Sequence, residues 1–63
     1  MTVTRAQRRA ILRLALSMEV HCERVDVEVT EGENGALRVR RAFDQVVEHF
    51  VVEQDGAARP EVA

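Results

Sequence analysis

The sequence predicts an all-α fold, an antiparallel helical hairpin with helices at about residues 4–30 and 36–54. Two observations lead to this prediction. Apolar residues recur with the 3.6-residue period of a helix on both sides of one short segment. That segment, residues 31–35, contains two glycines and the one Asn-Gly pair of the chain, which is typical of a turn. Two helices joined by so short a loop are expected to pack against each other.

The first helix is expected to begin at Thr4, because Thr4 and Gln7 have the spacing of a capping box. In that motif each side chain satisfies a backbone N–H group that the start of a helix leaves without a partner. No Gly, Pro or Asn lies between Arg5 and Thr30, so nothing local ends the helix before the turn. Its expected packing face carries no charged residue and consists of Ile11, Leu14, Ala15, Met18, Cys22, Val25 and Val29.

The second helix is predicted from apolar residues spaced three and four apart. They are Ala36, Val39, Phe43, Val46, Val47, Phe50 and Val51. Gly56 stands where a helix commonly ends on a left-handed residue. Residues 1–56 are therefore expected to form a single small helical domain, and residues 57–63, which include Pro60, a mobile C-terminal tail.

An α-β-β-α fold with a β-hairpin at about residues 25–40 is the alternative. Residues 25–30 alternate strictly between β-branched and polar side chains, and residues 36–40 alternate as well. The cross-strand pairs would be Val29 with Leu37, Val27 with Val39, Glu28 with Arg38 and Asp26 with Arg40. Helices at 4–20 and 41–54 would flank this hairpin. The helical hairpin is favoured because the chain entering the first strand contains no turn residue.

The size of the chain points to association with a partner. A chain of 63 residues buries roughly 60% of its unfolded surface, and a domain this small often depends on a disulfide, a metal or oligomerisation. Cys22 is the only cysteine, so an intramolecular disulfide is excluded, and no pair of Cys or His has zinc-finger spacing. We therefore expect the protein to form a homodimer, as a four-helix bundle, or to dock on a larger protein.

A second apolar line on the first helix is the expected partner surface. It lies opposite the packing face and consists of Leu12, Leu16, Val20 and Val27, with Arg9 and Arg13 at its rim. An uncovered apolar line of this kind favours association. The sequence thus predicts a non-catalytic protein–protein interaction module: a small homodimeric regulator, an inhibitor, or an accessory subunit.

Nucleic-acid binding is the alternative function. Residues 1–18 contain four arginines and no acid, and each arginine can neutralise one phosphate. These candidate contacts are Arg5, Arg8, Arg9 and Arg13. The net charge of −2 argues against this alternative, and so does the scarcity of aromatic residues. Phe43 and Phe50 are the only two, and both are expected to be packed inside rather than to stack on bases.

Catalysis is not expected, and no cofactor or metal is implied. Neither His21 nor His49 has a carboxylate three positions before it, as a di-iron site in a helical bundle requires. Cys22 lies on the apolar face beside acidic residues, which disfavours a reactive thiolate. No apolar run is long enough to span a membrane, so a cytoplasmic protein is expected.

Overall fold

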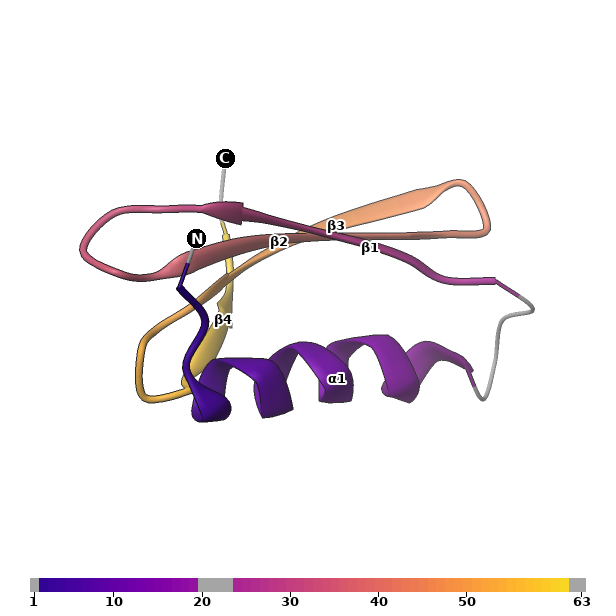
Figure 1. The fold of residues 1–63 in the computed structure, drawn as a ribbon. Helices are drawn as coiled ribbons and strands as arrows, with labels where there is room; N and C mark the ends of the chain where they lie inside the picture. Colours follow the sequence, from indigo (N-terminus) through magenta and orange to yellow (C-terminus); the bar gives the residue numbers. More distant parts are fainter. Residues whose placement is uncertain (1, 20–23, 62–63) are drawn as a thin grey trace.

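The computed structural model describes residues 2–19 and 24–61, and for residues 18 and 19 the backbone alone. One helix precedes four strands: α1 (Arg5–Glu19), β1 (Asp26–Glu31), β2 (Leu37–Phe43), β3 (Val46–Val52) and β4 (Ala58–Pro60). Each strand pairs antiparallel with the next, in the order β1-β2-β3-β4. The helix α1 runs along one face of this sheet, and the other face stays open (Figure 1). The fold is therefore α+β with two layers.

The predicted all-α helical hairpin is wrong, and the four-helix bundle that it implied is wrong with it. Residues 36–54 contain β2 and β3 instead of a second helix. The error has a geometric cause. The turn between the two strands has two residues, so odd-numbered residues of β2 and even-numbered residues of β3 share the face toward α1. Along the chain four of their apolar members, Val39, Phe43, Val46 and Phe50, are then spaced 4, 3 and 4, which imitates a helix.

The first helix is also shorter than expected, because the segment that begins at Asp26 is a strand rather than its last turns. The hairpin of the alternative fold is present as β1 and β2, with its register moved by two residues: Val29 pairs with Val39, and Glu28 with Arg40. A shift of two keeps every side chain on its expected face. The helix that the alternative placed at residues 41–54 is wrong, since β3 lies there.

The turn predicted at residues 31–35 is confirmed. Asn34 and Gly35 both have positive φ, at 55° and 78°. The Ala36 N–H donates to the carbonyl oxygen of Glu33 at 3.0 Å and closes the turn. This is the backbone that an Asn-Gly pair favours in a β-hairpin.

The turn between β2 and β3 adopts positive φ without glycine, at 44° for Asp44 and 67° for Gln45. We expect Gln45→Gly to stabilise the protein by about 0.5–1 kcal/mol, because a side chain is strained in this conformation and glycine is not. The melting temperature in a circular dichroism scan should rise by about 4–8 °C per kcal/mol. The matched control is Gln45→Ala, which keeps the Cβ atom and should give no such rise. An equal gain in both variants would contradict the strain argument.

The core lies between α1 and the sheet. Buried Ala10, Val39 and Val52 form its centre. The half-buried residues packed around them are Ile11, Leu14, Val27, Val29 and Phe50. Ile11 and Leu14 of the predicted packing face therefore do face inward, which confirms that part of the prediction, whereas Cys22 lies outside the described residues.

Gly56 and the segment after it have a different role from the one predicted. Gly56 has φ of 90°, but it follows β3 and does not end a helix. A Cβ atom there would lie 2.9 Å from the carbonyl oxygen of Ala6, so glycine lets the β3–β4 connection approach the start of α1. Residues 58–60, inside the expected tail, pair with β3 as β4. This part of the tail therefore belongs to the sheet.

The predicted capping box at the start of α1 is confirmed. The Thr4 N–H donates to Gln7 Oε1 at 2.9 Å, and the Gln7 N–H donates to Thr4 Oγ1 at 3.0 Å. The Gln7 side chain is fully buried, and its Nε2 also donates to the carbonyl oxygens of Gly35 and Val52 at 2.9 and 3.3 Å. Gln7 thus both caps the helix and attaches it to the β1–β2 turn and to the end of β3.

Candidate interaction surface

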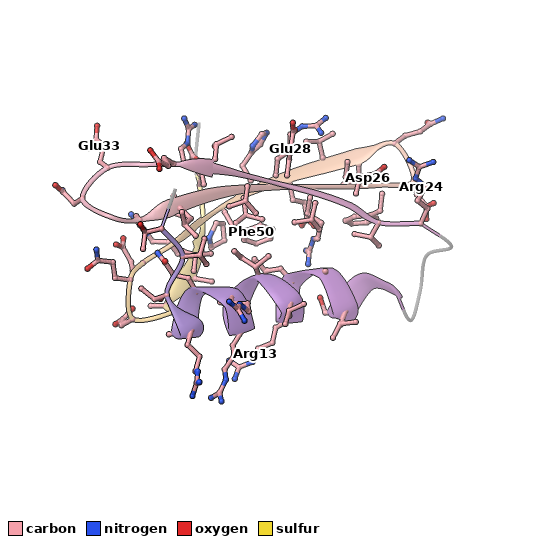
Figure 2. All side chains as sticks on the ribbon, in the orientation of Figure 1. Arg13, Arg24, Asp26, Glu28, Glu33 and Phe50 are labelled. Atoms are coloured by element: carbon pink, nitrogen blue, oxygen red, sulfur yellow. The ribbon has the colours of Figure 1, made fainter. Side chains whose placement is uncertain are left out.

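The outer face of α1 points away from the sheet and carries arginine and leucine side chains. We call this surface the basic-leucine face; its members are Arg5, Arg8, Arg9, Leu12, Arg13 and Leu16, all exposed. At 100° per residue, Leu12 and Leu16 lie near its midline and Arg8 and Arg13 at its two margins. Figure 2 shows Arg13 on this side, directed away from the sheet. The fold therefore gathers these residues on one continuous surface.

The two leucines near the middle of this face are exposed to solvent. Leu12 is 51% exposed and Leu16 is 56% exposed. They are one helical turn apart, so their side chains are neighbours on the surface. Two adjacent leucines left half in water form a small apolar centre that the protein's own core does not use.

The arginines around this centre form no ion pair with any acidic side chain that the structure describes. The ion pairs among the described residues involve Arg24, Arg38, Arg40, Arg41 and Arg59, and none involves an arginine of α1. The first turn of α1 carries no acidic residue either. Positive side chains near the N-terminal end of a helix meet its positive dipole end and destabilise it. Folding alone does not explain this placement.

The structure brings together Leu12, Leu16, Arg9 and Arg13 of the predicted partner surface, and also the four arginines predicted for nucleic-acid contact. Val27 is not part of it. It lies in β1, half-buried, and packs against the core, because the chain has left the helix before that position. Val20, the remaining predicted member, lies outside the described residues.

The open face of the sheet is a charged surface that the helical prediction missed. In Figure 2, Glu28 points away from α1 on this side. Its cations are paired within the protein: Arg40 Nη1 lies 3.8 Å from Glu28 Oε2, and Arg59 Nη1 lies 2.9 Å from Glu53 Oε1. The alternation of apolar and charged side chains at residues 36–40 was the feature of the sequence that indicated this face. Unlike the basic-leucine face, it neutralises its own charges.

A groove on the open face is lined by Gly32, Arg38, Val51, Arg59 and Glu61, together with further acidic residues around the β1–β2 turn. The guanidinium groups of Arg38 and Arg59 each already bind a carboxylate of the protein. A ligand site needs polar groups free to converge on the ligand. The internal pairing of this groove therefore does not indicate one.

The Arg38–Glu61 pair fastens the end of β4 and gives a pH-dependent prediction. Two hydrogen bonds, at 2.6 and 3.2 Å, join the guanidinium to the carboxylate, and the Glu61 N–H donates to the carbonyl oxygen of His49 at 2.8 Å. The side-chain hydrogen bond from Arg38 lowers the pKa of Glu61 below its ordinary value of 4.5, and the same bond raises the pKa of Arg38. The stabilisation is therefore present above the unfolded-state pKa and is lost as the pH falls through the folded-state pKa.

We expect the Glu61 amide proton to exchange faster with solvent, relative to the chemical rate, as the pH falls below about 4.5. Amide exchange measured by NMR over this range checks it. Glu61→Gln serves as the control, because it cannot be protonated and should exchange with the same protection throughout. Unchanged protection of Glu61 in the parent protein at low pH would contradict the prediction.

The described residues hold no cluster of three or more His, Cys, Asp or Glu placed to bind a metal; His21 and Cys22 lie outside them. Within the same part of the chain, no helix is long and apolar enough to cross a membrane. Comparison with protein-family models, curated proteins and solved structures finds no match to this chain. Function must therefore be inferred from the surfaces. Val46 and Val47 of β3 are also exposed, at 46% each, but the basic-leucine face combines exposed leucines with arginines that form no ion pair among the described residues.

Proposed function

We propose that the protein is a non-catalytic interaction module that binds a partner protein through the basic-leucine face. The observation that carries this proposal is the exposure of Leu12 and Leu16 on a helix face whose arginines form no ion pair among the described residues. Protein interfaces have an apolar centre within a polar rim, and arginine is enriched among their contact residues. The face has both features.

Nucleic acid fits this surface less well, although the arginines suit phosphate. Leu12 and Leu16 share the midline with Arg5, and a nucleic-acid backbone would place phosphate and sugar oxygens against leucine side chains that donate no hydrogen bond. The only two aromatic rings are half-buried, and the Arg41 guanidinium lies over both, 4.8 Å from the Phe50 centroid and 5.6 Å from that of Phe43. They are not placed to stack on bases.

A second copy of the chain is also disfavoured as the partner on this face. A two-fold dimer apposes the same patch on both protomers, so the interface would gather the arginines of both protomers with no acidic residue of this face to pair with them. Like charges brought together at an interface are destabilising by several kcal/mol. Of the two partner classes that the sequence predicted, we therefore propose the larger protein rather than a homodimer.

A photo-crosslinking side chain at position 16 tests this proposal in an extract of the source cells. The expected product is a protein adduct that resists nuclease. The same side chain at Thr30, which is exposed on the open face, is the matched control and should give no adduct. Adding Arg9→Glu with Arg13→Glu should reduce the position 16 adduct by about tenfold or more, since two charges at the rim are reversed.

Each other outcome of this experiment contradicts the proposal. A nuclease-sensitive adduct would show a nucleic-acid surface, and an adduct of twice the chain mass would show self-association. Equal labelling at positions 16 and 30 would show that the basic-leucine face has no specific partner. Far-ultraviolet circular dichroism of each variant verifies that the fold is unchanged.

A further inference from the structure

Charged and apolar side chains are unevenly distributed along the helix axis of the basic-leucine face. Arg5, Arg8 and Arg9 lie in the first turn and a half of α1, and no acidic residue accompanies them. Leu12 and Leu16 follow one and two turns later. The positive end of the helix dipole adds to the arginine charge at the N-terminal half. The surface therefore has a strongly positive half followed by an apolar half, in which Arg13 lies at the margin of the two leucines.

The shape of the face favours a helix, rather than an extended peptide, as the partner segment. Leucines at i and i+4 form a short ridge, which fits between the side-chain rows of a second helix. A helix satisfies its own backbone hydrogen bonds, whereas an extended peptide lying on a helix surface leaves its N–H and C=O groups without partners there. From Arg5 to Leu16 the face is about 17 Å long at 1.5 Å per residue, which a partner helix of three to four turns covers.

We propose that the partner segment is an acidic amphipathic helix that packs antiparallel to α1. Its C-terminal half carries carboxylates beside Arg5, Arg8 and Arg9, and its N-terminal half places apolar side chains on Leu12 and Leu16. This inference rests on the proposed function and adds the chemistry and the direction of the partner.

The helix dipoles favour the antiparallel direction. It puts the negative C-terminal end of the partner beside the positive N-terminal end of α1, whereas a parallel helix would bring two positive ends together. Carboxylates near its own C-terminus destabilise the free partner helix, as the arginines destabilise the start of α1. Docking places the carboxylates beside the arginines and so offsets the destabilisation of both helices. The partner segment therefore gains helix content when it binds.

Two synthetic peptides of about 14 residues and identical composition test the direction, a length at which isolated helices are marginal. One has leucines in its N-terminal half and glutamates in its C-terminal half, and the other has the reverse order. Titration of each labelled peptide with the full chain, followed by fluorescence anisotropy, should show at least tenfold tighter binding of the first at low salt. The reversed peptide is the more helical one when free, because its glutamates lie at the N-terminal end, so peptide propensity works against the expected result.

The matched protein variants are Arg5→Gln with Arg8→Gln and Arg9→Gln, which should remove the preference, and Leu12→Ser with Leu16→Ser, which should weaken both peptides. Equal affinities, a preference for the reversed peptide, or no binding of either would overturn the inference. The position 16 adduct decides the proposed function separately: if it is a protein adduct while the peptides fail, the function stands and this inference does not. Tighter binding of a DNA duplex than of both peptides would overturn both the proposed function and this inference.

Discussion

Replacing Gln7 with alanine is expected to lower the free energy of unfolding by about 3 kcal/mol. The substitution removes the acceptor for the Thr4 N–H and the donor to the carbonyl oxygens of Gly35 and Val52, at a site with no exposed surface. A domain of 63 residues has a total stability of about 3–9 kcal/mol at usual values per residue, so the loss is a large part of it. Urea denaturation followed by circular dichroism gives the number.

The control for Gln7 is glutamate, which keeps the length of the side chain and the acceptor of the capping box. Gln7→Glu aims a carboxylate at two carbonyl oxygens, which disfavours the charged form and raises the pKa of the introduced carboxyl in the folded state. Relative to the parent protein, this variant should be most stable below the unfolded-state value of about 4.3 and should lose stability as the pH rises through the folded-state pKa. If Gln7→Glu unfolds at the parent's urea midpoint at neutral pH, the two carbonyl contacts do not stabilise the fold.

The features that the sequence predicted correctly depend on local spacing. The capping box needs only the three-residue interval from Thr4 to Gln7, and the β1–β2 turn needs only Asn34 and Gly35. The arginines and leucines of the basic-leucine face follow from helical geometry over residues 5–16, which holds whatever the rest of the chain does. These features are present in the structure although the predicted fold class was wrong.

The features that could not be predicted depend on contacts distant in the chain. The turn at Asp44 and Gln45 contains neither Gly, Pro nor Asn, and Asp44 alone is too weak a signal to predict two positive φ values. The pairing of β4 with β3 had no signal, because Ala58–Pro60 is exposed, three residues long and without alternation. Val27 fell on the predicted partner line only because the helix was extended past its true end.

Arg41 is the residue that made β2 hardest to recognise from the sequence. It lies on the face toward α1, between Val39 and Phe43, where an apolar residue would have completed a recognisable strand pattern. Its exposure is only 7%, and its guanidinium lies 4.8 Å from the ring centroid of Phe50. A charged residue is accepted in a core when its hydrogen bonds are satisfied by residues from other elements, and a single sequence does not reveal those partners.

The guanidinium of Arg41 connects three elements. Its Nη1 donates to the carbonyl oxygen of Leu14 at 2.7 Å and to Ser17 Oγ at 3.2 Å, both in α1, and its Nε donates to Glu48 Oε1 at 3.0 Å in β3. The Gln7 contacts attach the first turn of α1 to the sheet, and the Arg41 contacts attach its third and fourth turns. Leu16 lies within the segment that Arg41 holds, so this interaction fixes the position of the apolar half of the basic-leucine face.

We therefore expect Arg41→Ala to lower the free energy of unfolding by about 3 kcal/mol, through the lost hydrogen bonds and the space left beside the two rings. Arg41→Met fills most of that space without the charge and should cost only about 1 kcal/mol, because it keeps the packing beside the two rings and because Glu48, whose side chain is 38% exposed, can be solvated once its partner is gone. Urea denaturation of both variants measures the difference. Equal losses would mean that the polar contacts, rather than the packing of the arginine stem, hold α1 on the sheet. In that case amide exchange at residues 14–17 should accelerate in Arg41→Met as much as in Arg41→Ala, and binding through Leu16 should weaken in both.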